Sequence, residues 1–163
     1  MPDHPFFPPV KENEMVRFDL STSIYRPLNQ VFEFVVAPEN NFQWQYGTLT
    51  STQVSRGDMG TGSLFRAVSH LLGRRVETVY EVTVYELNKR YGFKSVSGPV
   101  DSYTLYTFDV AMGATRLNLS TETDPKGVFQ PNDTIVIKKL KKEHKENLAM
   151  LKNVLEAHRI AGM

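Results

Sequence analysis

Residues 47–123 read as one uninterrupted series of strands, and a long amphipathic segment follows them. Glycine, proline and asparagine punctuate the series at short intervals, so each strand is joined to the next by a short loop. Short loops connect antiparallel neighbours, because parallel strands need a longer crossover. The strands are expected at residues 47–55, 64–72, 75–88, 91–97, 101–111 and 115–123. The pattern predicts an antiparallel sheet whose apolar face needs a cover.

The final amphipathic segment supplies that cover. It is expected to begin near Asn132 or Asp133, either of which can cap a helix, and to run to about His158. Its apolar stripe falls within an arc of roughly 80°. The stripe consists of Ile137, Leu140, His144, Leu148, Leu151 and Leu155. We expect it to face a cupped sheet, with a possible pocket between the two.

The chain before the strand series contributes one more strand and a pair of short helices. Residues 15–26 alternate between apolar and polar side chains, which is the period of a half-buried strand. Apolar residues then follow Pro27 at helical spacing until Pro38 stops the run. Residues 39–44 are expected to form a short second helix or turn beside the sheet.

Composition excludes several classes of function. The 163 residues fit one domain, expected over residues 14–163 after a loose extension at residues 1–13. With 19 Lys and Arg against 18 Asp and Glu, nothing favours nucleic acid as a partner. The absence of cysteine suits a reducing cytoplasm, and no stretch approaches the roughly 20 apolar residues that span a bilayer. We therefore expect a cytoplasmic protein without a membrane span.

Common metal, cofactor and hydrolase motifs are missing from the sequence. The glycines of residues 57–62 precede a strand rather than a helix, so they indicate a turn and not a phosphate loop. The four histidines lack metal-ligand spacing, and no Gly-x-Ser-x-Gly elbow is present. We predict no metal and no cofactor.

His144 is the titratable residue that stands out, because it lies among leucines on the stripe of the final helix. One interpretation is a core histidine that is hydrogen-bonded to a strand tyrosine or serine. The other is a ligand-contacting donor, or a general acid/base whose pKa is tuned by burial. The sequence leaves both interpretations open.

Period-two alternation assigns one face of each strand to the concave side, provided that no bulge interrupts it. It turns Val84 inward and places Tyr85 on the outer face. The inward tyrosines and threonines fit either an ordinary core or a mostly apolar cavity with a few polar contacts. With Trp44 near the entrance, the candidate ligand-binding residues are Trp44, Phe65, Ser69, Tyr80, Val82, Phe93, Tyr106, Phe108, Leu119, Thr121, Ile137, Leu140, His144, Leu148 and Leu151.

A series of short motifs carries a family resemblance. Residues 25–34 read YRPLNQVFEF, residues 37–40 read APEN, and Trp44 follows. Later marks are GTG at 60–62, LGR at 72–74 and GATRL at 113–117. Over about residues 15–158 the chain resembles the START-like, or SRPBCC, superfamily and its polyketide cyclase/dehydrase-like branch.

The resemblance implies an α+β helix-grip fold: a curved seven-stranded antiparallel sheet wrapped around a long C-terminal helix, enclosing a pocket for apolar ligands. Family members bind lipids, hormones or polyketides, and some act on them. The branch shares no catalytic signature that carries over to particular residues here, and a fold alone does not define a reaction.

Three functions are compatible with the sequence. The first is binding of an apolar or amphipathic small molecule, lipid- or polyketide-like, by a monomer or weak homodimer. The second is a cofactor-independent cyclase, aromatase or dehydratase with His144 as acid/base and Tyr80 or Tyr106 as hydrogen-bond donors. The third is a protein interaction module that docks through the outer sheet face at Tyr85, Leu87, Tyr103 and Leu105.

Overall fold

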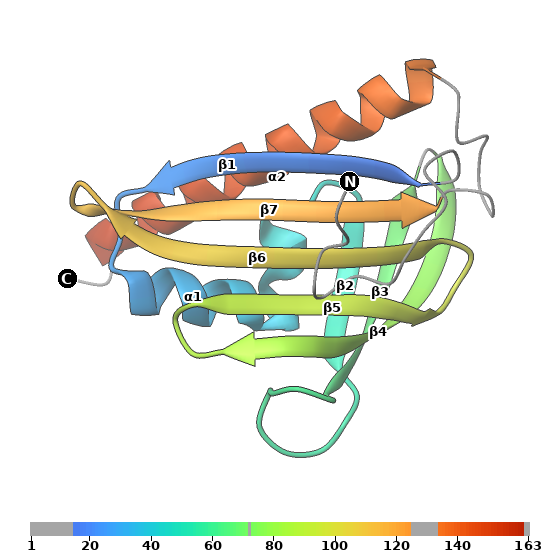
Figure 1. Cartoon of the computed structure of the whole chain (residues 1–163), viewed down its shortest axis with the longest axis horizontal. Helices are drawn as coiled ribbons and strands as arrows, with labels where there is room; N and C mark the ends of the chain where they lie inside the picture. Colours follow the sequence, from blue (N-terminus) through green and yellow to red (C-terminus); the bar gives the residue numbers. More distant parts are fainter. Residues whose placement is uncertain (1–14, 72, 125–133, 162–163) are drawn as a thin grey trace.

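The computed structural model describes residues 15–71, 73–124 and 134–161. Seven antiparallel strands form a single curved sheet in the order β1-β7-β6-β5-β4-β3-β2 (Figure 1). They are β1 (Val16–Ile24), β2 (Thr48–Gln53), β3 (Leu64–Leu71), β4 (Arg74–Glu86), β5 (Arg90–Ser97), β6 (Asp101–Ala111) and β7 (Ala114–Asp124). The predicted meander is confirmed, with small shifts at the strand ends. β1, the first strand in the chain, pairs with β7, the last.

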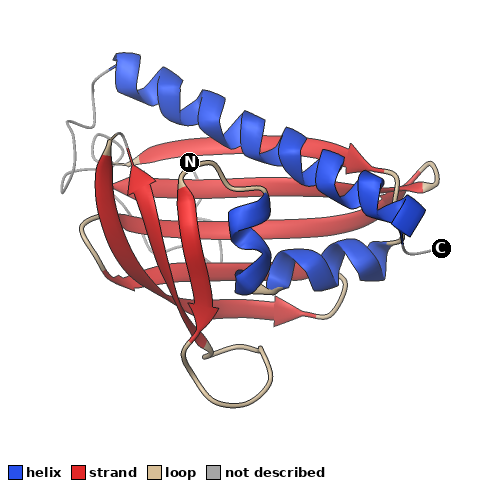
Figure 2. Cartoon of the chain, turned by 180° about the vertical axis from the view of Figure 1, so that it is seen from behind, coloured by secondary structure: helices blue, strands red, loops and turns tan. Residues whose placement is uncertain are grey.

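The helices of the described residues lie on the concave side of the sheet (Figure 2). α1 (Leu28–Val36) and the short 3-10 helix η1 (Pro38–Gln43) connect β1 to β2, and α2 (Thr134–Ala161) crosses the sheet diagonally. This arrangement confirms the predicted α+β helix-grip fold. The predicted caps Asn132 and Asp133, and the extension at residues 1–13, lie outside the described residues.

The main core is concentrated at the end of the cup that α1 occupies. Phe32 of α1 is fully buried and meets Phe108 and Tyr85 edge-on, with ring centroids 5.1 and 5.5 Å away. Leu148 and Leu151 of α2 join the same cluster. Full burial of one such side chain contributes about 1.5–3 kcal/mol. Packing at this end therefore supplies much of the stability and leaves the opposite end less filled.

Polar contacts fix the C-terminal half of α2 against the end of β1. Glu156 accepts a hydrogen bond from the backbone N–H of Tyr25 at 3.0 Å. Lys152 donates to the backbone oxygen of Ser23 at 2.6 Å and lies 2.7 Å from the Glu156 carboxylate. These contacts hold this half of α2 over the packed end, so its N-terminal half spans the less filled end.

A bulge in β4 corrects one part of the predicted inward pattern. Val82 pairs with Phe93 but Val84 pairs with Gly92, so one extra residue is accommodated between them. Beyond the bulge the two faces exchange. Tyr85, predicted to face outward, packs in the main core, whereas Val84 packs with Leu105 and Tyr103 in a separate small cluster. The predicted outer patch thus loses Tyr85, and Leu105 is itself buried while Leu87 remains exposed.

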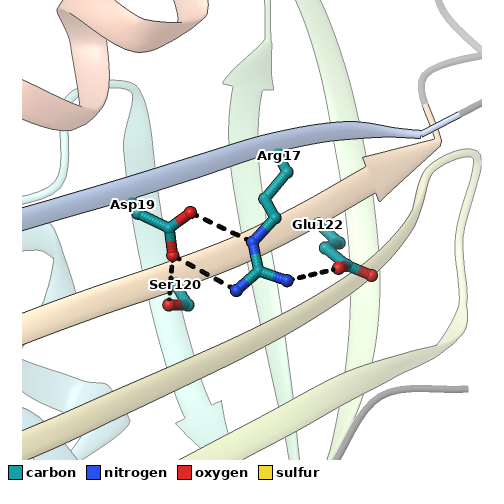
Figure 3. A network of polar contacts seen from close by, with 4 residues as sticks. All are labelled: Arg17, Asp19, Ser120 and Glu122. Carbon is teal, nitrogen blue, oxygen red and sulfur yellow. Dashed lines mark hydrogen bonds and ion pairs between the residues drawn. The ribbon is translucent and has the colours of Figure 1, made fainter. Parts of the chain in front are cut away.

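A charged network on the convex face ties β1 to β7 (Figure 3). Arg17 donates from Nη1 to Glu122 Oε1 at 2.9 Å and from Nε to Asp19 Oδ2 at 3.0 Å, and Ser120 donates to Asp19 Oδ1 at 2.6 Å. The hydrogen bond with Asp19 is the main reason that the pKa of Arg17 is raised. Arg17 lies directly opposite Glu122, and Asp19 opposite Ser120. The network therefore favours this strand register over a slipped one.

A tight turn joins β6 to β7. Only Met112 and Gly113 lie between the paired residues Ala111 and Ala114, and their φ angles are +52° and +79°. Two positive φ values in a two-residue loop are typical of a type I′ hairpin, which matches the twist of the flanking strands. A methyl group added at Gly113 would meet nothing within 4 Å.

Candidate functional site

The less filled end of the cup contains two adjoining cavities between the sheet and α2, with volumes of about 190 and 140 Å³. Together they lie near the lower end of the roughly 300–1,000 Å³ typical of small-molecule pockets. The residues that border both are Gln45, Tyr80, Thr104, Thr121, His144 and Asn147. We call the larger cavity the polar compartment, after the hydroxyl groups of Ser102 and Thr123 that border it. We call the smaller one the apolar compartment, after Phe93, Tyr106 and Leu119.

The strand register arranges the concave side chains in rows whose polarity changes along the strands. The row at the packed end contains Leu20, Leu119, Tyr106 and Tyr91; the middle row contains Phe18, Thr121, Thr104 and Phe93; the third contains Val16, Thr123 and Ser102. Leu119, Tyr106 and Phe93 border the apolar compartment. Ser102 and Thr123 border the polar compartment. A gradient from apolar to hydroxyl-rich surface thus runs through the site.

Neighbouring hydroxyl groups interact with each other across the floor of the cavities. The Oγ1 atoms of Thr104 and Thr121 lie 3.1 Å apart, and either can donate. Tyr80 stacks on Phe65 with ring centroids 4.9 Å apart. Burial raises the pKa of the Tyr80 hydroxyl, while hydrogen bonding with Thr78 and Ser102 acts in the opposite direction. Tyr80 therefore stays protonated at neutral pH and can both donate and accept.

His144 lies on the α2 side of both compartments. Its ring is 5.3 Å from that of Phe18, tilted by 48°, and the imidazole has no hydrogen bond with any described residue. The contact with a tyrosine or serine that the core interpretation required is thus not made within the described part of the chain. Burial lowers the pKa of His144 from its ordinary value of 6.5. A neutral imidazole facing a cavity can donate from one nitrogen and accept at the other.

Glu143 and Asn147, one turn apart on α2, border the polar compartment beside His144. Burial raises the pKa of Glu143, an effect that nearby Lys139 partly offsets. Asn147 Oδ1 accepts a hydrogen bond from the backbone N–H of Tyr46 at 2.6 Å. This bond links α2 to the segment that follows η1.

The segment after η1 separates the cavities from an outer groove. Trp44, Gln45, Tyr46 and Asn147 line this groove as well as one or both cavities. Trp44 is only 4% exposed, and its indole Nε1 is buried without a hydrogen-bond partner in the described structure. Trp44 thus lies between the groove and the apolar compartment, and its predicted place near an entrance stays a prediction.

Gly47 anchors the same segment to the end of β3. Its φ is +82°, and an added Cβ would lie 2.5 Å from the backbone oxygen of His70. The backbone N–H of His70 also donates to the Gly47 oxygen at 2.7 Å. Only glycine permits both this backbone conformation and this close approach.

The structure brings most of the predicted ligand-binding residues to the cavities. Those that line one or both compartments are Trp44, Ser69, Tyr80, Phe93, Tyr106, Leu119, Thr121, Leu140, His144 and Leu148. Phe65, Val82, Phe108 and Leu151 instead belong to the packed core, and Ile137 lies in a small cluster with Leu140 and Phe18. Phe65, Val82, Phe108 and Leu151 are covered by neighbouring side chains, whereas Ile137 is half-buried. Their predicted contact with a ligand remains untested.

Several lining residues were not among the predicted site residues. Ser102 and Thr123 share the strand alternation of Thr104 and Thr121, so extending the inward rows by one position would have included them. Glu143 and Asn147 lie just beside the apolar stripe of α2, where helical periodicity gives them a common face. Gln45 follows no periodic signal, because its position depends on how η1 docks against α2.

The structure offers no preformed metal centre and no helical membrane span within the residues it describes. No three His, Cys, Asp or Glu side chains of this part of the chain are grouped as metal ligands. None of its helices combines the length and hydropathy needed to cross a bilayer. The polar groups that line the cavities are hydroxyl, imidazole, amide and carboxyl groups.

The sheet, the gripped helix and the cavity between them define a START-like, or SRPBCC, protein. The chain belongs to the polyketide cyclase/dehydrase and lipid transport family, whose model matches residues 15–156. A comparison with curated protein sequences gives no significant match.

Solved structures show the same fold at low sequence identity. Ara h 8.0201 superposes with a TM-score of 0.66 and 12% identity, covering 88% of this chain and 99% of that one. The protein CV1439 from Chromobacterium violaceum superposes with a TM-score of 0.64 and 14% identity, covering 88% of this chain and 97% of that one. At this identity the likeness concerns the fold alone.

Proposed function

We propose that the protein binds an apolar or amphipathic small molecule in the paired cavities between the sheet and α2. The observation that carries the proposal is the cavity space itself, which lies beside a buried core cluster that includes Phe32 and Leu151. An unfilled interior costs contact energy, so a packed fold with a hollow end is well suited to hold a ligand there. The match to a family described by polyketide chemistry and lipid transport supports this class of ligand.

A cavity-filling substitution tests the proposal. Thr121→Phe should fill the junction of the two compartments, whereas Thr50→Phe places the same ring on the exposed surface of β2. Nile red, a neutral apolar dye, should bind the wild-type chain and the Thr50→Phe variant with one-to-one stoichiometry, measured by its fluorescence. Thr121→Phe should lose this binding while its circular dichroism stays native. Absence of dye binding to the wild type, or equal binding by both variants, would contradict the proposal.

An enzyme that rearranges or dehydrates a polyketide-like chain is a second candidate. The observation that favours it is that Glu143 and His144 both line the polar compartment, so an acid and a base border one cavity. General acid/base catalysis needs such groups within hydrogen-bond reach of the substrate. His144→Ala should abolish turnover if this candidate is right, and should only shift ligand affinity if the protein is a binder.

A cytoplasmic location remains a prediction from composition.

Native mass spectrometry of the chain purified without added ligand, followed by denaturing extraction, gives an independent measurement. A stoichiometric small molecule released on denaturation would support the binding function and supply candidates for turnover assays. A protein that purifies empty and binds no dye would contradict it.

A further inference from the structure

Two deeply buried apolar side chains lie on the convex face of the sheet, where a side chain is ordinarily solvated. Val84 and Leu105 are 6% and 4% exposed, and they pack with the half-buried Tyr103. We call these three residues the outer cluster. The helices of the described residues all lie on the concave side (Figure 2). None of these helices therefore accounts for the burial of the outer cluster.

The strands around the outer cluster do not cover it either. Val84 and Leu105 both pair with Gly92, one on each side, and Gly92 has no side chain to shield them. Leu105 Cδ1 lies only 3.2 Å from where a Cβ on Gly92 would stand, so Leu105 leans over the glycine. The small polar Ser120 lies opposite Leu105 on β7. The burial thus indicates a cover that is not part of the sheet.

Two stretches outside the described residues contain aromatic side chains that could form this cover. Residues 1–14 contain Phe6 and Phe7, and residues 125–133 contain Phe129. The second stretch connects β7 to α2, and α2 lies on the concave side. It has to lead from the sheet to the opposite face from the outer cluster. Residues 1–14 are under no such constraint, because they precede β1.

Residues 1–14 are long enough to reach the outer cluster. Val16 pairs with Thr123, which pairs with Ser102, so Leu105 is two strands across and three residues along. Strands about 4.8 Å apart with a rise of about 3.4 Å per residue make this a distance of about 14 Å. Phe7 is nine residues before Val16, and an extended chain of that length spans up to about 30 Å.

The sequence of this stretch suits the face of a sheet better than its edge. Residues 5–10 read PFFPPV. Proline has no backbone N–H and cannot continue a strand ladder. The same property leaves fewer unpaired donors when a chain lies across a sheet face that offers it no backbone partners. A phenylalanine buries roughly 150–250 Å², so Phe6 and Phe7 can supply the apolar area of the cover.

We propose that residues 5–10 lie across the convex face of the sheet and pack Phe6 and Phe7 on the outer cluster. This contact closes the outer face of the sheet. A partner protein or a second copy of the chain can then dock there only by displacing the segment, which disfavours the outer-face interaction module considered from the sequence. The proposal does not depend on any ligand in the cavities.

The accessibility of a thiol at position 84 tests the proposal in the full chain. The sequence contains no cysteine, so Val84→Cys introduces a single thiol at a side chain of similar size. Its reaction with a water-soluble maleimide should be slow, because the thiol is reached only when the cover opens. Adding Phe6→Ser and Phe7→Ser should speed the reaction at least about tenfold. Phe6→Leu and Phe7→Leu, which keep apolar side chains, should retain the protection.

Phe129→Ser in the Val84→Cys chain is the matched control, since it removes a ring from the other stretch, and it should leave the rate unchanged. Circular dichroism and urea denaturation report whether each variant is folded. A fast reaction of Val84→Cys alone, or an unchanged rate after the two serine substitutions, would overturn the inference. So would acceleration by Phe129→Ser alone, which would assign the cover to residues 125–133. A rate that falls as protein concentration rises would overturn it in favour of a second copy.

A cross-link tests the position of the segment without removing both phenylalanines. Lys94 lies opposite Tyr103 in the register, whereas Arg66 lies on β3, farther across the sheet. A short bismaleimide should join the two thiols of the Phe7→Cys/Lys94→Cys chain and should not join those of Phe7→Cys/Arg66→Cys. Equal yields from the two pairs, or a link to position 66 alone, would contradict the proposed position.

Discussion

At the scale of single residues, the site depends on groups whose protonation is set by burial. His144 titrates below its ordinary value because the imidazolium form loses solvation in the cavity wall. Glu143 titrates above its ordinary value of 4.5 for the same physical reason. Both shifts favour the neutral form of the side chain, so the cavity carries less charge than the sequence alone would indicate.

These opposite shifts predict a dependence of stability on pH. The unfolded chain protonates His144 at about 6.5, above the folded-state pKa, so the free energy of unfolding should fall as the pH drops below 6.5 toward the folded pKa. Glu143 acts in the opposite sense: its contribution is present below 4.5 and is lost as the pH rises through its raised folded pKa. Urea denaturation between about pH 7 and pH 4 measures both effects.

Two variants separate the contributions of the neighbouring residues. His144→Gln should flatten the acid-side fall in stability relative to the wild type, and Glu143→Gln should make it steeper. An acid-side slope that is identical in the wild type and the His144→Gln variant would show that His144 protonation is not coupled to folding.

At the scale of elements, strand order and helix positions could be predicted because turn residues and periodicity mark them directly. The side of the sheet on which each β4 side chain lies beyond Val82 could not be predicted, since no glycine or proline marks the bulge that exchanges Val84 and Tyr85. The hydroxyl residues that line the cavities from the sheet follow strand alternation, so some of them, such as Ser69 and Thr121, were predicted from the sequence. Gln45 could not be predicted in this way, because the docking of the η1 segment on α2 is a tertiary contact that no local pattern encodes.

Gly47 and Gly113 both have a positive φ but differ in how closely their surroundings approach them. Gly113→Ala should cost about 1 kcal/mol, because its φ is positive but the added methyl group meets no neighbour. Gly47→Ala should cost at least about 3 kcal/mol, because a similar φ is combined with an approach of 2.5 Å to the His70 backbone oxygen. Thermal and chemical denaturation of the two variants give the comparison. Equal losses would mean that the Gly47 segment moves freely away from β3.

At the scale of the whole molecule, the cup is divided into a packed end and a hollow end along α2. Leu151 is fully buried in the packed core with Phe32, whereas Leu140 borders the polar compartment near His144. The same helix thus serves stability with its C-terminal half and the site with its N-terminal half. Its contacts with β1 through Lys152 and Glu156 lie in the former.

Leucine truncations should report this division. Leu151→Ala should reduce the free energy of unfolding by about 3–5 kcal/mol, because it opens a new void in close-packed surroundings. Leu140→Ala should cost about 2 kcal/mol, since it enlarges a space that already exists, and should alter Nile red binding more than Leu151→Ala does. Urea denaturation and dye titration of both variants test the difference. A larger stability loss for Leu140→Ala would contradict the division of the cup.

The hydrogen bond between the Tyr46 backbone and Asn147 has a consequence for the residence time of a bound molecule. It joins α2 to a short segment outside the strands, so breaking it leaves every β-ladder intact. If a ligand is held in the cavities as proposed, we expect its release to need only a local opening of this segment, whose free energy is below that of global unfolding. The exchange rate of such a ligand would then follow the motion of this segment and not the stability of the sheet.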